Sequence, residues 1–153
     1  MATYAITVNG KPRTVESWDS AQPLLYLLRN ALGLKGPKYG CGEGQCGSCA
    51  VLIDGAAARA CQTSVSAAAG KSVTTLEGLG SAERPHPVQA AFIAEQAAQC
   101  GYCTNGMVMS AAALLARTPR PSDAEIRDAL AGNLCRCGSH DRVLRAVRRA
   151  AGA

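Results

Sequence analysis

Short apolar runs separated by turn residues fill the first half of the chain. Residues 4–16 (YAITVNGKPRTVE) contain two such runs around Asn9-Gly10. Asn and Gly both tolerate positive φ, so this pattern predicts two strands joined by a tight hairpin turn. Further strands are predicted over residues 50–53, 56–61 and 72–76, with Asp54-Gly55 joining the first two. These strands indicate a small sheet.

One helix is predicted among these strands, between residues 20 and 33. Leu24, Leu28 and Leu32 recur at the spacing of one helical face. Pro23 suits the first turn, and Gly33 suits the C-terminal cap. Several strands with one helix across them indicate an α+β fold.

After a turn-rich linker over residues 78–87, the apolar pattern takes a helical period. Residues 106–116 are apolar almost all round, so a helix here must be buried. Ser122 and Glu125 form a capping-box pattern at the start of another helix. We predict a four-helix bundle from helices over residues 87–98, 106–116, 122–130 and 140–150. The predicted domains are residues 1–80 and residues 81–153.

The charge pattern argues against a nucleic-acid partner. The net charge is +5, and aromatic residues make up only 4% of the chain. The outer face of the last predicted helix carries Arg142, Arg145, Arg148 and Arg149. Such a face is typical of a solvated surface or a subunit contact. We therefore expect no nucleic-acid binding.

Hydrophobic residues make up 48% of the chain, which is enough to bury a core. No apolar run approaches the roughly 20 residues that a bilayer span needs, so membrane insertion is not expected. Residues 1–16 show no basic segment followed by an apolar one and no twin-arginine pair. We expect a cytoplasmic protein, although a partner could supply an export signal or a membrane association.

Eight cysteines divide equally between the two halves. Disulfides are a poor explanation for them, because such bonds rarely persist in a reducing compartment. Cys41, Cys46, Cys49 and Cys61 have the spacing C-x4-C-x2-C-x11-C, and Cys100, Cys103, Cys135 and Cys137 have the spacing C-x2-C-x31-C-x-C. Four thiolates per half match the ligand count of either a structural zinc ion or an iron–sulfur cluster.

The local spacing favours iron–sulfur clusters. Structural zinc sites use close pairs of cysteines, whereas C-x4-C-x2-C followed by a distant fourth cysteine is the plant-type [2Fe–2S] pattern. The glycines of this loop are expected at positive φ, where backbone N–H groups can approach the anionic sulfurs. These glycines are Gly40, Gly42, Gly44 and Gly47.

The second set of cysteines precedes two predicted helices. Helix N-termini carry unpaired N–H groups and partial positive charge, so two helix starts form a good cradle for an anionic cluster. The pair Cys135 and Cys137, with only Arg136 between them, is too tight for a common zinc knuckle. A zinc-binding interaction module is nevertheless an alternative interpretation of the cysteines.

The segments CGEGQCGSC, QCGYCTNGM and GNLCRCG together resemble the small iron–sulfur subunit of the xanthine oxidase family of molybdenum hydroxylases. The resemblance covers the whole chain. It implies a β-grasp, plant-type ferredoxin domain followed by a helical domain, each with one [2Fe–2S] cluster. It also implies that a large subunit, which binds molybdenum through a pterin cofactor, is the partner and holds the active site. No catalytic residue is then expected in this chain.

The resemblance also implies roles for individual residues. Cys41, Cys46, Cys49 and Cys61 would hold the ferredoxin-type cluster, and Cys100, Cys103, Cys135 and Cys137 the cluster nearer molybdenum. Gln99 would contact the molybdopterin, and Cys103 would be the ligand beside it, so that electrons enter at residues 99–103. His86 and His140 are not needed as ligands and are expected to be capping or surface groups.

Two departures from the common family pattern point to a subgroup. Residues 104–106 are Thr-Asn-Gly where many members have Thr-Pro-Gly, and residues 138–140 are Gly-Ser-His where many have Gly-Thr-Tyr. The chain looks more like the two-component enzymes that hydroxylate nicotinate or isoquinoline, which implies an N-heteroaromatic substrate and often a cytochrome acceptor. The alternatives are the iron–sulfur subunit of an aldehyde or xanthine dehydrogenase with a flavin partner, and a free-standing ferredoxin-like carrier.

Overall fold

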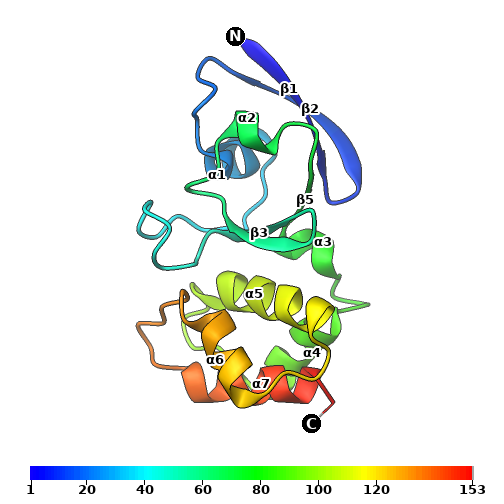
Figure 1. Cartoon of the computed structure of the whole chain (residues 1–153), viewed down its shortest axis with the longest axis vertical. Coiled ribbons are helices and arrows are strands. Elements are labelled where there is room, and N and C mark those ends of the chain that lie inside the picture. Colours follow the sequence, from blue (N-terminus) through cyan, green and yellow to red (C-terminus); the bar gives the residue numbers. More distant parts are fainter. Residues whose placement is uncertain (153) are drawn as a thin grey trace.

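The computed structural model describes residues 1–152, and it stacks a sheet half on a helical half along the long axis (Figure 1). The sheet has five strands in the order β2-β1-β5-β3-β4. The strands are β1 (Ala2–Val8), β2 (Lys11–Ser17), β3 (Ala50–Ile53), β4 (Ala56–Arg59) and β5 (Ser72–Thr74). The predicted α+β class is confirmed.

Two tight hairpins form where the sequence predicts them. Asn9 and Gly10 have φ values of 51° and 74° between β1 and β2, and Asp54 and Gly55 have values of 49° and 84° between β3 and β4. Two consecutive residues at positive φ match the right-handed twist of the flanking strands. β5 then joins the hairpins, because it pairs in parallel with β1 and antiparallel with β3.

The helix predicted between residues 20 and 33 is shorter and less regular. It consists of α1 (Leu24–Tyr26), which continues as the π-helical turn η1 (Leu27–Ala31). Leu24, Leu25 and Leu28 are fully buried beneath the sheet. Leu27 and Leu28 of this π turn are consecutive in the sequence and are both buried.

Two short helices were not predicted: α2 (Val65–Ala68) and α3 (Leu76–Leu79). Both are too short to show a helical period. The Ser64 hydroxyl caps α2 by accepting the Ala67 N–H. β5 ends at Thr74 rather than at residue 76, because Thr75 is already the N-cap of α3.

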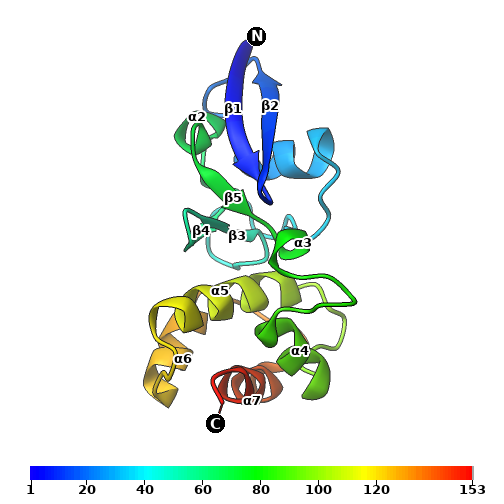
Figure 2. The same cartoon turned by 90° about the vertical axis from the view of Figure 1, so that its right-hand side faces the viewer.

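The helical half consists of α4 (Pro87–Ala94), α5 (Thr104–Arg117), α6 (Asp123–Leu130) and α7 (His140–Ala150). All four predicted helices are present, and the Ser122–Glu125 capping box is formed. α4 ends at residue 94 rather than 98, because Gln96 turns the chain with φ 48°. Helix α5 is buried from Asn105 to Leu114 and lies between the sheet and the other helices (Figure 2).

Each half has its own hydrophobic cluster. Leu76 and Leu79 of α3 pack against the helical cluster, although they precede the predicted domain limit at residue 80. That limit stays a prediction, and the last residue of the second predicted domain, Ala153, lies outside the described residues. No helix within residues 1–152 is long and apolar enough to cross a bilayer.

Candidate metal centres

The first cysteine set lies in the loop between η1 and β3, with its fourth member just after β4. Cys41 and Cys46 are partly exposed on the loop, whereas Cys49 and Cys61 are 2% and 6% exposed beneath it. β3 and β4 form one hairpin, so the strand pairing itself brings the sequence-distant Cys61 to the loop. Cys49 and Cys61 contact each other through their thiols.

Backbone N–H groups of the loop point at the sulfurs. The amides of Glu43 and Gln45 donate to Cys41 Sγ over 3.3 Å, and the amide of Cys46 does so over 3.4 Å. These backbone bonds, chiefly from Cys46 and Glu43, lower the pKa of the Cys41 thiol to about 7. Burial instead raises the pKa of the Cys49 thiol to about 11. The loop is thus folded so that its backbone N–H groups donate to a cysteine sulfur atom.

Three of the four loop glycines have the predicted conformation. Gly42, Gly44 and Gly47 have φ values of 73°, 75° and 79°. The prediction was wrong for Gly40, whose φ is not positive. Gly40 is needed for a different reason, since a Cβ on it would lie 2.6 Å from Cys46 Sγ. It provides space for a sulfur atom rather than a turn.

The second set gathers where α5 and α7 begin. Cys103 is the N-cap residue of α5, and the turn with Cys135 and Cys137 directly precedes Ser139, the N-cap of α7. The thiols of Cys103 and Cys135 contact each other across these two starts. Cys103 is buried and Cys100 is exposed. The predicted placement of these cysteines at helix starts is confirmed.

Ser139 is the main hydrogen-bonding partner of the second set. Its hydroxyl lies 3.2 Å from Cys135 Sγ, and its N–H donates to the same sulfur over 3.4 Å. Burial opposes ionisation of Cys135, but the two bonds from Ser139 outweigh it and lower the pKa to about 6. Burial raises the pKa of the Cys103 thiol to about 12.

The donor set fits two-iron clusters. Within residues 1–152, none of the eight cysteines is disulfide-bonded, so all eight thiols are free to bind metal. The cysteines contact one another in pairs, which are Cys41 with Cys46, Cys49 with Cys61, and Cys103 with Cys135. A two-iron cluster divides its four ligands between two irons, whereas zinc needs all four on one ion.

Gln99 is exposed on the segment that leads from α4 to Cys100. It lines a surface hollow of about 320 Å³ together with Cys137, Ser139 and Arg142. Cys103 does not line this hollow, because it is buried in the helical core behind Cys100. The structure thus brings Gln99 beside Cys137, the cysteine directly before α7.

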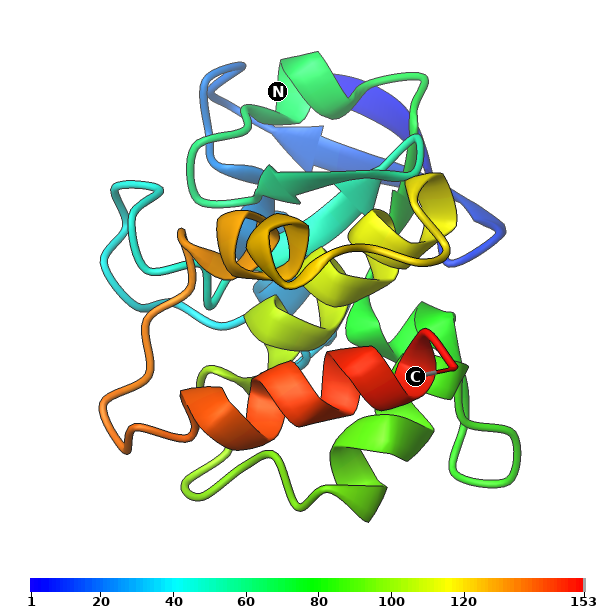
Figure 3. The same ribbon diagram turned by 60° about the horizontal axis from the view of Figure 1, so that its bottom comes forward.

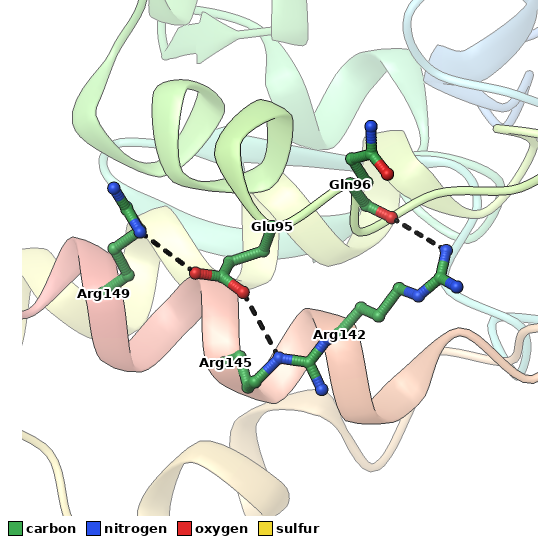
Figure 4. A network of polar contacts seen from close by, with 5 residues as sticks. All are labelled: Glu95, Gln96, Arg142, Arg145 and Arg149. Carbon is green, nitrogen blue, oxygen red and sulfur yellow. Dashed lines mark hydrogen bonds and ion pairs between the residues drawn. The ribbon is translucent and has the colours of Figure 1, made fainter.

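An ion-pair network holds the end of α4 against α7 (Figure 4). Glu95 binds Arg145 and Arg149, each over 3.2 Å, and Arg142 donates to the Gln96 carbonyl over 3.5 Å. The arginine face of α7 is therefore partly paired within the chain. These contacts join residues 95 and 96, which closely precede Gln99 in the sequence, to α7.

The two histidines are away from the sulfur contacts. His86 is the N-cap of α4, where its Nδ1 accepts the Val88 N–H over 3.2 Å. Burial lowers the pKa of His86, in keeping with a neutral ring that accepts a hydrogen bond. His140 Nε2 lies 3.5 Å from the Asn133 carbonyl oxygen at the start of α7. The expected capping role of His86 is confirmed.

Sequence reasoning did not find the contact between the two cysteine regions. Both the cysteine loop before β3 and the turn before α7 lie on the same side of the molecule (Figure 1 and Figure 3). The Leu134 N–H donates to the Cys46 carbonyl over 2.9 Å, and the Tyr102 hydroxyl donates to the Tyr39 carbonyl. The sequence does contain one signal for this contact, because Asn105 is a polar residue at the start of a largely apolar helix.

Comparisons with known proteins identify both halves. A family model described as a 2Fe-2S iron-sulfur cluster binding domain matches residues 6–73, and one described as a [2Fe-2S] binding domain matches residues 75–148. A nicotinate dehydrogenase subunit of Pseudomonas putida is 62% identical, and the match covers 97% of this chain and 94% of that one. The chain belongs to the xanthine oxidase family of molybdenum hydroxylases, among the small iron–sulfur subunits.

Other members of this family give the same result. The alpha subunit of isoquinoline 1-oxidoreductase from Brevundimonas diminuta is 52% identical over 94% of both chains. The structure of quinoline 2-oxidoreductase from Pseudomonas putida 86 matches with a TM-score of 0.91 at 42% identity, covering 99% of this chain and 94% of that one. Aldehyde oxidoreductase from Desulfovibrio gigas matches with a TM-score of 0.94 at 41% identity, and the match covers 99% of this chain but 17% of that larger chain.

These matches confirm the predicted fold, a ferredoxin-type domain followed by a helical [2Fe–2S] domain. They also confirm two [2Fe–2S] clusters as the cofactors of this family member.

Proposed function

We propose that this chain is the electron-transfer subunit of a molybdenum hydroxylase. A large molybdopterin-binding subunit supplies the electrons, and this chain passes them to an external acceptor. The observation that carries the proposal is the pair of four-cysteine sets in two adjoining [2Fe–2S] domains, joined by a hydrogen bond from Leu134 to Cys46. A chain with two such centres and no catalytic residue of its own fits the transfer of electrons.

The eight cysteines are the proposed ligands. Cys41, Cys46, Cys49 and Cys61 hold the cluster of the ferredoxin domain, residues 1–80, and Cys100, Cys103, Cys135 and Cys137 hold the cluster of the helical domain, residues 81–153. When bound, each cluster accepts and releases one electron. The chain's own residues hold the cluster sulfurs: loop amides serve the first site, and Ser139 serves the second.

The number of clusters suits the chemistry of the proposed partner. Hydroxylation of a carbon by water releases two electrons and two protons, and two one-electron centres can take up both electrons in turn. The proposed substrate class is N-heteroaromatic, because the relatives at 62% and 52% identity are named for nicotinate and isoquinoline. The proposed acceptor is a cytochrome c or a flavin-containing protein. We propose that the complex acts in the cytoplasm.

Electrons are proposed to enter at residues 99–103. Gln99 is exposed and can reach the molybdopterin of the large subunit, while Cys103 lies behind it as the inner ligand of the same cluster. The hollow that Gln99 shares with Cys137 gives the partner cofactor access to this cluster. The ion pairs from Glu95 to α7 hold this segment in place.

Reconstitution with the large subunit tests the proposal. The chain, loaded with clusters, is mixed with a candidate large molybdopterin-binding subunit, and the visible iron–sulfur absorbance is followed after addition of nicotinate or a related heteroaromatic compound. We expect bleaching only when the substrate is present together with the large subunit. Clusters that stay oxidised here, yet are reduced by a soluble reductase and pass electrons to unrelated acceptors, would support the free ferredoxin instead.

The same assay tests Gln99. Gln99→Ala is expected to leave both clusters loaded and to slow their reduction by substrate several-fold, because one hydrogen bond at the partner cofactor is lost. Gln45→Ala is the matched control, since Gln45 is an exposed glutamine within the other cysteine loop and donates to Cys41 Sγ through its backbone amide, which the substitution keeps. Equal reduction rates in the two variants would leave Gln99 without this role.

A further inference from the structure

Three small or polar residues fill the space between the two cysteine regions. Gly47 lies between Cys46 and Cys49 in the first loop. Gly106 is in the first turn of α5, three residues after Cys103, and Asn133 is two residues before Cys135. Each of the three thus lies within three residues of a cysteine. Gly47 of the sheet half is in close contact with Gly106 and Asn133 of the helical half.

The contact among these residues leaves no room for a methyl group. A Cβ on Gly106 would lie well under 3.0 Å from the Gly47 carbonyl oxygen and 2.9 Å from Asn133 Oδ1. A Cβ on Gly47 would lie 2.6 Å from the Gly132 carbonyl oxygen and closer still to Asn133 Oδ1. Half of the atoms in the way are backbone atoms, which cannot rotate aside, and the others belong to the buried Asn133 side chain. The two halves thus meet with no space left for an added methyl group at either glycine.

Gly106 is informative because it lies in the first turn of a helix. Glycine has a lower helix propensity than alanine, so local helix stability does not require glycine here. Its φ is not positive, so the backbone conformation does not require glycine either. The close approach of the Gly47 carbonyl is the remaining reason for glycine at this position.

Buried hydrogen bonds hold this approach fixed. The side-chain amide of Asn105 donates to the Ser48 carbonyl over 2.9 Å and to the Ala50 carbonyl over 3.1 Å, and both bonds are buried. Within the helical half, the amide of Asn133, which is 2% exposed, donates to Ser110 Oγ over 3.1 Å and so holds Asn133 in place against Gly47. Breaking buried bonds of this kind leaves unpaired polar groups, which is costly. The distance between the two cysteine regions therefore cannot increase without breaking these bonds.

We infer that Gly47, Gly106 and Asn133 are positioning residues that set the distance between the two bound clusters. They act by fixing how closely the two cysteine loops approach, and all three are buried within this chain. The inference rests on the proposed function only in that electrons must pass between the clusters. A longer distance slows the transfer of an electron from the reduced cluster to the oxidised one.

The test measures the spacing directly. The full chain carrying both clusters is reduced chemically, and the magnetic interaction between the two paramagnetic clusters is measured by electron paramagnetic resonance. This interaction weakens steeply with distance and needs no partner subunit. In Gly106→Ala we expect both cluster signals at full intensity, a reduced splitting between them, and several-fold slower electron equilibration between the clusters.

Gly132→Ala is the matched control. It adds the same methyl group at the same junction, but its nearest neighbour is the end of the Arg59 side chain, 2.6 Å away, which can shift to another rotamer although it also donates to the Gly132 carbonyl over 2.9 Å. The splitting in this variant should equal that of the unchanged protein. If Gly106→Ala, fully loaded, also retains the original splitting, the inference is wrong.

A second variant tests the inference if the Gly106→Ala protein does not bind both clusters. Asn133→Ala adds no volume and removes the side chain against which Gly47 packs. We expect a broadened or shifted splitting with both individual signals retained, and an unchanged splitting would overturn the inference. The clusters are reduced chemically here, so a shifted splitting supports the inference without any contribution from the large subunit. If the large subunit fails to reduce the clusters in the reconstitution assay, only the proposed function is contradicted.

Discussion

The two cysteine regions stabilise sulfur atoms by different means. In the sheet half, Cys41 receives three amide hydrogen bonds from residues no more than five positions away in the sequence. In the helical half, Cys135 Sγ accepts the Ser139 N–H, lies 3.2 Å from the Ser139 hydroxyl and contacts Cys103, which another helix supplies. The first site is built by local backbone, and the second by the packing of two helix starts.

This difference determines how each site responds to change. A backbone cradle cannot be removed by altering a side chain, but it depends on glycines that leave room for the sulfurs. A site built from helix starts tolerates changes in local conformation, but it depends on one hydroxyl and on tertiary packing. The two sites should therefore fail independently and for different reasons.

The largest effect is expected from losing a ligand. Cys46→Ser should remove the ferredoxin-type cluster and leave the second, and Cys137→Ser should do the reverse. Each variant should hold about two irons instead of about four, because one [2Fe–2S] unit is lost. Iron and sulfide analysis, with electron paramagnetic resonance of the reduced protein, measures this. Loss of both signals from either change would mean that the sites are not independent.

A smaller effect is expected at Gly40. Gly40→Ala places a methyl group 2.6 Å from Cys46 Sγ without any strain from positive φ. We expect lower occupancy of the first cluster, with the second signal as the internal standard. Gly132→Ala again serves as the control, because its methyl group meets the end of the Arg59 side chain and no cysteine sulfur. Equal occupancy of the two clusters in Gly40→Ala would show that the loop can move aside.

Ser139→Ala should alter the second cluster without removing it. The hydroxyl makes no helix-capping hydrogen bond, so α7 should be unaffected. A hydrogen bond to sulfur favours the more negative reduced cluster, and bonds to charged groups contribute about 1.5–3 kcal/mol. We expect a lower reduction potential for the second cluster only. A redox titration that shifts both clusters equally, or neither, would contradict this.

The same contrast explains which features the sequence predicted. Local signals gave the hairpin at Asn9-Gly10, the capping box at Ser122 and the positive φ of Gly42, because each depends on a few adjacent residues. The spacing of the cysteines indicated the clusters for the same reason. The π turn η1 and the short helix α3 had no such signal, since tertiary packing rather than local propensity stabilises them.

The role of Gly40 and the junction at Gly106 could not be predicted for a related reason. A glycine that turns the chain and a glycine that makes room for a distant atom look identical in sequence. Only the folded structure shows that Gly40 faces Cys46 Sγ and that Gly106 faces the Gly47 carbonyl. The family resemblance assigned ligands and partners, but it does not report such distances.

The smallest effect concerns Glu77, which ties α3 to the segment before the first cysteine loop. Its carboxylate accepts the N–H groups of Lys35 and Gly36 over 2.8 and 2.6 Å and the Thr75 hydroxyl over 2.7 Å. Burial disfavours ionisation of Glu77, but the bonds from Gly36 and Thr75 outweigh it and hold its pKa below the ordinary value.

The pKa of Glu77 is lower in the folded state than in the unfolded chain, so its carboxylate stabilises the fold. This stabilisation is complete above the pKa of an unfolded glutamate, about 4.3. It is lost as the pH falls through the lower folded-state pKa. Because Glu77 is exposed, solvent screening limits the effect to about 1 kcal/mol or less. Glu77→Gln should therefore lower the free energy of unfolding slightly at neutral pH and flatten its decline in acid. Urea unfolding at neutral and acidic pH measures both, with Glu16→Gln on exposed β2 as the control. Parallel pH profiles for Glu77→Gln and the unchanged protein would show that these bonds add nothing to stability.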